Sequence, residues 1–216
     1  MRNFQVKIVC VEETMHSTGN GCTYDDMRSM KNQNYDGIDR LTGLYNGEYA
    51  LKEIQAYMEQ NPECTAAVYI MDIDNFRTVD ETLGRLFGNE IMKEIAAAIC
   101  QVFGKQAVIG RIGGDKFLIF EKNYESVGRI RENAKELCHR ARSTFKGEDQ
   151  NFVISLSIGI AIMPDDGYEW KQLAQHATQA LTYVKNHGKD GYEFYNSEMD
   201  TVDEPVSYTH LRAHET

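Results

Sequence analysis

The sequence lacks any apolar run long enough to cross a bilayer and has no closely spaced pair of cysteines. A membrane-spanning helix needs about 20 mostly apolar residues, and the N-terminus has no signal-peptide core. We therefore expect no membrane segment and a cytoplasmic location. The five cysteines are scattered and odd in number, which argues for reduced thiols and against a zinc site.

Positive charge is also scarce: the chain has 23 Lys and Arg residues and 33 Asp and Glu residues, which give a net charge of −10. This balance argues against a broad nucleic-acid surface, which needs clustered cations. An acidic protein can still bind a nucleotide when metal ions or a few placed lysines offset the phosphates.

Hydrophobic periodicity predicts one domain of alternating helices and strands. Apolar residues at helical spacing predict four helices, and continuous or alternating apolar runs predict strands. The expected helices cover 47–60, about 86–103, 125–144 and 170–184; the expected strands lie in 65–76, on both sides of a Gly113-Gly114 turn in 107–120, in 152–163 and in 191–195. This order predicts an α+β fold with a βαββαβ core and helices packed on one sheet.

Two acids follow the buried strand in "MDIDNF", Asp72 and Asp74. Ligands often bind where strands of such sheets end, although acids also simply cap the exit of a strand into solvent. The hairpin around Gly113 and Gly114 can bring Asp115 beside Asp72. Two converging carboxylates repel one another unless a hard cation such as Mg²⁺ lies between them. That is the composition of a nucleotidyl-transfer site, where metal ions hold a triphosphate and activate a ribose hydroxyl.

Six blocks then resemble the GGDEF domain of diguanylate cyclases, in the order of that family. They are "DRLTGLYN" (39–46), "DIDNF" (72–76), "LGRLFGNE" (83–90), "RIGGDKF" (111–117), "SIGIA" (157–161) and "ALTYVKNHGKDG" (180–191). The resemblance implies a nucleotide-cyclase or palm-like core with a central, mainly antiparallel sheet. It also implies that two GTP-loaded copies meet face to face and form cyclic di-GMP.

The resemblance assigns roles to matching positions. Asp72, Asp115 and the Ile73 carbonyl would hold Mg²⁺. Gly113 and Gly114 would let the backbone approach the phosphates. Lys185 and Lys189 would reach the triphosphate as point charges, although without the resemblance a solvated helix end would be the preferred explanation of these two lysines.

Lys116 departs from the family pattern, which has Glu at this catalytic position. An ammonium cannot ligate Mg²⁺. One unit-charge pair about 4 Å apart is worth roughly 4 kcal/mol at an effective dielectric of 20, so a cation beside a divalent ion is strongly unfavourable. Either the metal site is weakened or Lys116 swings away onto a phosphate, and cyclase chemistry should be lost or very slow.

Two further departures concern recognition. The family usually reads guanine with Asn and then Asp, whereas this chain has Asp80 and Asn89. The pair looks exchanged, and a carboxylate at 80 could accept both guanine N–H groups; alternatively, neither residue serves binding. The inhibitory RxxD of the family is replaced by "GKQA" at 104–107, so no inhibitory product site is expected.

The resemblance divides the chain into an N-terminal extension or linker (1–36), which could end an upstream sensor domain, a GGDEF domain (37–196) and a tail (197–216). The last stretch, "VSYTHLRAHET" (206–216), resembles a translated sequencing adapter, with a disordered polar terminus as the alternative. If it is an adapter, the natural chain was cut near Glu204, and a phosphodiesterase domain could follow.

Three functions remain open from the sequence. The first is a catalytically impaired regulatory or GTP-binding module in a cyclic di-GMP signalling protein. The second is a working diguanylate cyclase that tolerates Lys116, and the third is a dimerisation or protein-contact module. The expected partners are GTP with Mg²⁺, a second copy of the chain through the GGDEF face, and the phosphodiesterase domain; no nucleic acid is expected.

Overall fold

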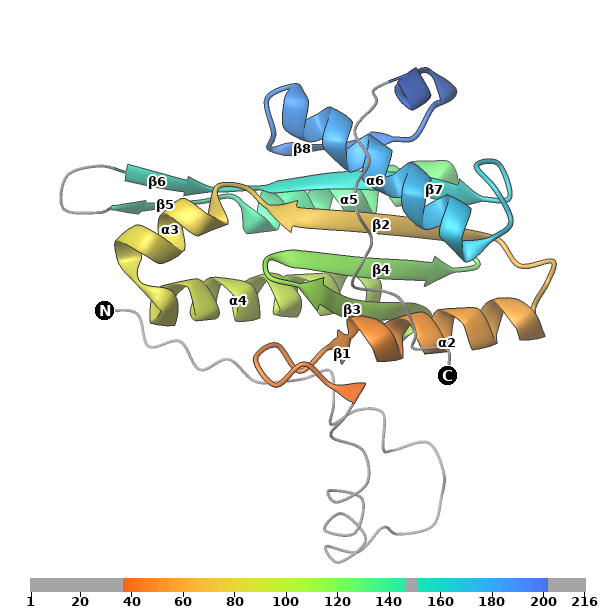
Figure 1. Cartoon of the computed structure of the whole chain (residues 1–216), viewed down its shortest axis with the longest axis horizontal. Coiled ribbons are helices and arrows are strands. Elements are labelled where there is room, and N and C mark those ends of the chain that lie inside the picture. The colour runs from red at the N-terminus through yellow and green to blue at the C-terminus, as the bar shows by residue number, and fades with distance from the viewer. Residues whose placement is uncertain (1–36, 147–150, 202–216) are drawn as a thin grey trace, which may run out of the picture.

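The computed structural model describes residues 37–146 and 151–201 (Figure 1). The predicted N-terminal extension (1–36) and the suspected adapter segment (206–216) lie outside these residues. Helices and strands alternate along the described chain. In chain order they are β1 (Tyr45–Asn46), α2 (Gly47–Gln60), β2 (Ala66–Ile73), α3 (Phe76–Leu83), α4 (Arg85–Phe103), η3 (Gly104–Gln106), β3 (Ala107–Gly113), β4 (Lys116–Lys122), α5 (Val127–Ala141), β5 (Ser143–Lys146), β6 (Asn151–Ile154), β7 (Leu156–Met163), α6 (Trp170–Asn186), β8 (Gly191–Phe194) and η4 (Ser197–Thr201).

Six strands form one mixed sheet in the order β1-β3-β4-β2-β7-β8. The inner pairs β3–β4, β4–β2 and β2–β7 are antiparallel, while the edge pairs β1–β3 and β7–β8 are parallel. Helices α2 and α6 cover one face, and α4 and α5 cover the other. The prediction of an α+β fold with a βαββαβ core is therefore confirmed.

Strand β2 is the centre of the core, and all eight of its residues are buried. Side chains alternate between the two faces of a strand. Tyr69 and Met71 accordingly pack with α4 and α5, whereas Val68 and Ile70 pack with α2 and α6. This double burial explains why the sequence reads as a continuous apolar run rather than as an alternating one.

Two sequence predictions were incomplete around the helices. The prediction placed no helix between residues 60 and 86, but α3 occupies Phe76–Leu83 and ends at Gly84, whose φ of 87° breaks the helical path before α4. The helix predicted over 125–144 ends at Ala141, and the chain continues into the β5–β6 hairpin.

The strand predicted over 152–163 is divided at Ser155. Before this residue the chain pairs with β5, and after it with β2. The Ser155 carbonyl accepts from the Asp74 N–H at 2.9 Å, and the Ser155 hydroxyl donates to the Asp74 carboxylate at 2.7 Å. An apolar pattern does not reveal such a change of partner, because both halves are extended strands.

Helix α6 lies directly on β7 because of Gly159. A Cβ atom at this position would collide with the Ala177 carbonyl oxygen and the Leu181 amide nitrogen. Only glycine permits this backbone-to-backbone approach. Lys185, one helical turn beyond Leu181, is thereby carried over the end of β2.

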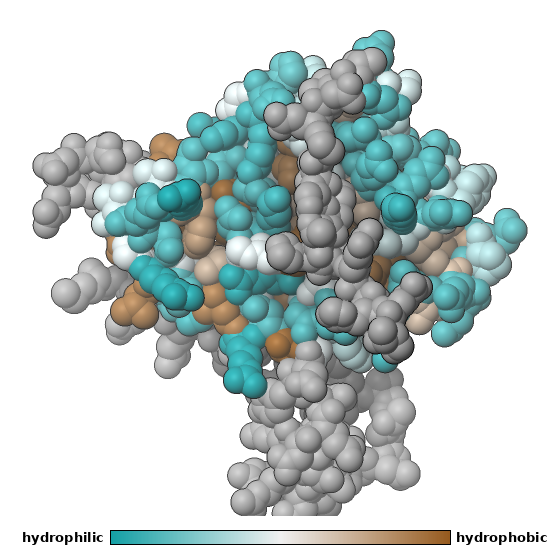
Figure 2. All heavy atoms as spheres, viewed as in Figure 1, coloured by the Kyte–Doolittle hydropathy of each residue, from teal (hydrophilic) through white to brown (hydrophobic). Residues whose placement is uncertain are grey.

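The surface seen in Figure 2 is mostly hydrophilic, with small separate hydrophobic spots. Within residues 37–146 and 151–201, none of the helices has both the length and the apolar composition that a bilayer crossing requires. In the same part of the chain, no disulfide joins Cys64, Cys100 and Cys138.

Candidate nucleotide site

Asp72 and Lys185 form the centre of the candidate site. The Lys185 ammonium is paired with the Asp72 carboxylate, whose side chain is only 6% exposed. Burial raises the pKa of Asp72, the hydrogen bond and charge of Lys185 oppose this shift, and the charge of Asp115 adds to it. The strand end therefore holds a carboxylate that needs a nearby cation to remain ionised.

The Gly113–Gly114 tip lies beside this pair. Gly113 and Gly114 have φ angles of 139° and 50°, and a Cβ on either would meet no atom within 4 Å. Glycine is therefore required here by backbone conformation rather than by crowding. The Asp115 carbonyl accepts from the Ile73 N–H at 3.2 Å, which fixes the tip against the end of β2.

Lys116 lies directly opposite Asp72 in the antiparallel register of β4 and β2. Residues opposed in this way project to the same face of a sheet, with Cβ atoms roughly 4.5–5.5 Å apart. The Lys116 side chain is exposed, and its charge acts to lower the pKa of Asp72. Where the family pattern has a third acid, the structure thus places a cation across from the buried carboxylate.

Asp74, the other candidate acid, has a structural role. It is 1% exposed and accepts from the Ser155 and Ser157 hydroxyls, both at 2.7 Å, and from the Asp190 N–H at 3.1 Å. These bonds satisfy the carboxylate. Asp74 therefore holds the loop after α6 and does not face a ligand.

That loop carries Lys189, whose ammonium donates to the Asn75 side-chain oxygen at 2.8 Å. Asn75, Lys189 and Asp190 all have positive φ angles, of 56°, 62° and 51°. Left-handed backbone is uncommon for residues other than glycine and clusters at functional sites. Its concentration here marks this end of the sheet as a constrained site.

Arg111 also holds the Gly113–Gly114 tip in place. It donates to the Gly114 carbonyl at 2.7 and 2.9 Å and pairs with Asp39 at 3.0 Å. Burial opposes ionisation of Asp39, but hydrogen bonds from Thr42 and the Arg111 charge together lower its pKa. The sequence alone suggested no role for Asp39 or Arg111, although the Asp-x-x-Thr spacing of a side-chain-capped turn was visible.

Asp80 and Asn89, the predicted guanine-binding residues, lie at the corner between α3 and α4. A Cβ on Gly88 would lie 2.6 Å from the Asp80 Oδ1 atom, so the Asp80 carboxylate rests against the backbone that leads into Asn89. Both side chains are partly exposed. The sequence placed them as a pair, and the structure brings them to the same corner.

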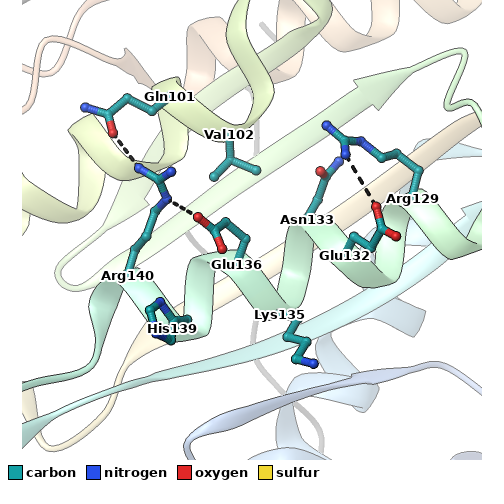
Figure 3. A pocket seen from close by; sticks show the side chains of 9 residues that line it. All are labelled: Gln101, Val102, Arg129, Glu132, Asn133, Lys135, Glu136, His139 and Arg140. Atoms are coloured by element: carbon teal, nitrogen blue, oxygen red, sulfur yellow. Dashed lines mark hydrogen bonds and ion pairs between the residues drawn. The ribbon is translucent and has the colours of Figure 1, made fainter.

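A separate hollow of about 570 Å³ lies between α4 and α5 (Figure 3). Four of its charged side chains form two ion pairs, Arg140 with Glu136 at 2.7 Å and Arg129 with Glu132 at 3.4 Å, and Arg140 also donates to the Gln101 side chain at 2.7 Å. Since α4 and α5 cover the face opposite α6, this hollow is not part of the candidate nucleotide site.

The residues around Asp72 do not fit a tightly held Mg²⁺ ion. Mg²⁺ requires near-octahedral oxygen ligands, but Asp72 is already paired with Lys185 and faces Lys116. In the described part of the chain, no three His, Cys, Asp or Glu side chains gather closely enough to hold a metal ion. The Mg²⁺ predicted from the sequence stays a prediction.

Comparison with known proteins identifies the family of this chain. By sequence, residues 37–191 match the family described as "Diguanylate cyclase, GGDEF domain". The chain belongs to the GGDEF family. The signaling protein YkoW of Bacillus subtilis is 28% identical over 161 residues, which are 73% of this chain and 20% of YkoW. MucR of Pseudomonas aeruginosa, a bifunctional diguanylate cyclase and cyclic di-GMP phosphodiesterase, is 32% identical over 75% of this chain and 24% of MucR.

Solved GGDEF structures share the fold. The GGDEF domain of TpbB (YfiN) from Pseudomonas aeruginosa aligns with a TM-score of 0.69 at 22% identity, over 76% of this chain and 96% of that one. DgcB of Caulobacter crescentus, solved with its coiled coil and cyclic di-GMP, aligns with a TM-score of 0.69 at 21% identity, over 79% and 92%. The chain thus corresponds to a GGDEF domain of cyclic di-GMP signalling proteins, and it spans about a fifth to a quarter of YkoW and MucR.

Proposed function

We propose that this GGDEF domain is a guanine-nucleotide-binding regulatory module with little or no cyclase activity. The observation that carries the proposal is the position of Lys116, opposite Asp72 across the β2–β4 pair. Cyclase chemistry needs metal ions that polarise the phosphate and activate the attacking hydroxyl. The Lys116 ammonium, which replaces the third acid, repels a metal ion at this position. The first acid, Asp72, is already paired with Lys185.

The parts of the site that would contact a nucleotide are retained. The Gly113–Gly114 tip leaves space for phosphate oxygens close to the backbone. Lys185 and Lys189 stand at the same end of β2 and can act as point charges. Asp80, at the α3–α4 corner, can accept the N1–H and N2–H of guanine, with Asn89 as its neighbour in the site.

The proposed partners follow from the family. GTP is the nucleotide, and a second copy of the domain would face the first across the nucleotide site. MucR, whose name includes a phosphodiesterase activity, is about four times the length that this chain matches. We therefore propose that the domain acts beside a phosphodiesterase domain and regulates it.

An active diguanylate cyclase is the second candidate. It is favoured by the retention of Asp72, Asp115 and both tip glycines and by the similarity to MucR. It requires Lys116 to turn away from the metal, for which the exposed side chain has room.

Isothermal titration calorimetry with GTP and Mg²⁺ tests the proposed function. We expect binding of GTP that is stronger than binding of ATP, because a carboxylate can accept the adjacent N1–H and N2–H of guanine, whereas the N1 of adenine carries no hydrogen. The absence of heat at millimolar GTP would contradict nucleotide binding and leave a role in protein contact alone.

A further inference from the structure

The site carries more positive charge than its family pattern specifies. Three ammonium groups, those of Lys116, Lys185 and Lys189, gather at the end of β2 with the carboxylates of Asp72 and Asp115. Among these five side chains the surplus is one positive charge. With an acid at position 116, two ammonium groups would face three carboxylates, leaving a surplus of one negative charge.

Of the three neighbouring acids, Asp39, Asp74 and Asp190, two are paired with arginines. Asp190 is paired with Arg142 at 2.9 Å, and Asp39 is paired with Arg111. Neutral donors do not cancel the charge of the Asp74 carboxylate, but Asp74 is 1% exposed and its oxygens already accept from two hydroxyls and one N–H, so it does not contact a ligand. The groups left to face a ligand at the tip are therefore the three lysines and the two acids.

A triphosphate is strongly anionic, so an acidic site can hold it only if divalent cations neutralise the contact. A site with surplus positive charge has no such requirement. Lys116 is fixed at its Cα by the sheet register opposite Asp72, while its side chain is exposed and can reach outward. A lysine is a compact charge on a flexible stem with three donors, suited to phosphate oxygens.

We propose that Lys116 takes the electrostatic place of the metal ion, so that this site binds the triphosphate of a nucleotide without requiring Mg²⁺. The inference rests on the proposed function, that this face binds a guanine nucleotide. A site of this kind differs from a weakened cyclase site, which would bind the nucleotide less tightly when the metal is removed.

The test is GTP binding to the whole chain by calorimetry, once with about 5 mM Mg²⁺ and once with EDTA at constant ionic strength. The Kd of the wild-type protein should differ by less than about threefold between the two buffers. Lys116→Glu should bind GTP about tenfold or more weakly than the wild type in EDTA and should regain its affinity when Mg²⁺ is added, because the substitution restores the acidic balance.

Lys122→Glu is the matched control. Lys122 lies at the other end of β4, and its replacement changes the net charge equally. This variant should bind GTP as the wild type does in both buffers. Lys116→Gln removes the charge without adding an acid and should weaken binding in EDTA to an intermediate degree. Thermal unfolding of each variant verifies the fold.

The outcomes separate the two proposals. Wild-type binding that disappears in EDTA would overturn the inference while leaving nucleotide binding intact. Equal EDTA-resistant binding by the wild type and Lys116→Glu would also overturn it, since Lys116 would then not be the cause. No binding of GTP in either buffer would contradict the proposed function itself.

Discussion

The Lys185 ammonium on α6 pairs with the Asp72 carboxylate on β2, joining a covering helix to the central strand of the sheet. The acid is 6% exposed and the lysine 32% exposed, so water screens the pair only in part. Two elements far apart in the sequence thus meet at the proposed nucleotide site.

Replacing Lys185 with Met should therefore cost stability. It leaves the buried Asp72 carboxylate without its cation, and we expect the free energy of unfolding to fall by about 1–3 kcal/mol. The double variant with Asp72→Asn should recover much of this loss. Lys171→Met, an exposed position on the same helix, should change it by less than about 0.5 kcal/mol. Equal stability of the Lys185 and Lys171 variants in urea would count against the pair.

Replacing Gly159 with Ala should displace α6 from the sheet. The new Cβ would meet backbone atoms of Ala177 and Leu181, which cannot rotate away, so a destabilisation of about 1–3 kcal/mol or more is expected. Gly128→Ala on α5 is the control, because its Cβ would meet only the Ser126 Oγ at 3.6 Å. Chemical denaturation measures both, and a Gly159 variant as stable as the control would contradict this explanation of how α6 packs.

Asp39 should contribute to stability in a pH-dependent way. Its folded-state pKa is lowered, so its contribution is present above the unfolded value of about 3.9 and is lost as pH falls through the lower folded value. The difference in unfolding free energy between the wild type and Asp39→Asn should therefore shrink as pH falls from about 5 to below about 3. Arg111→Met should reduce the same difference, whereas Arg77→Met, at an exposed arginine, should not. A difference in unfolding free energy between the wild type and Asp39→Asn that stays constant over this pH range would contradict a stabilising Asp39–Arg111 pair.

The α3–α4 corner should control the choice of base. Gly88→Ala would push the Asp80 carboxylate aside, because the new Cβ would lie 2.6 Å from its Oδ1. We expect the preference for GTP over ATP to fall about tenfold, the equivalent of roughly 1.4 kcal/mol, and thermal unfolding measures the accompanying loss of stability, because the Cβ would also lie 3.0 Å from the Phe76 ring. Asp80→Ala should do the same, and Glu81→Ala, next to it on the exposed side, should not. Calorimetry with both nucleotides decides this, and an unchanged preference would remove Asp80 from the site.

The sequence predicted the parts of this protein that repeat a simple pattern. The buried run of β2 and the stripes of α4 and α6 were identified because burial imposes their periodicity. Helix α3 was missed because eight residues with one fully buried side chain, Val79, form too short a stripe. The hairpin β5–β6 was missed because its second strand runs directly into β7.

Some residues of the candidate site could likewise be predicted from the sequence, and others could not. Asp72, Asp115 and the tip glycines are adjacent to strong local patterns, so their meeting point could be predicted. The structural role of Asp74 could not, since it depends on Ser155, Ser157 and the loop at Asp190, which are more than 80 residues away along the chain. Acids two residues apart on a strand end look alike in sequence and differ only in what the fold places beside them.

The most direct test of the central claim is product formation by the unaltered chain. The protein, at concentrations that allow pairing, is incubated with GTP and Mg²⁺, and cyclic di-GMP is quantified by mass spectrometry beside a Lys116→Glu variant. If Lys116 disables the metal site, the wild-type chain forms no product, or only traces. Turnover by the wild type equal to that of Lys116→Glu would contradict the claim.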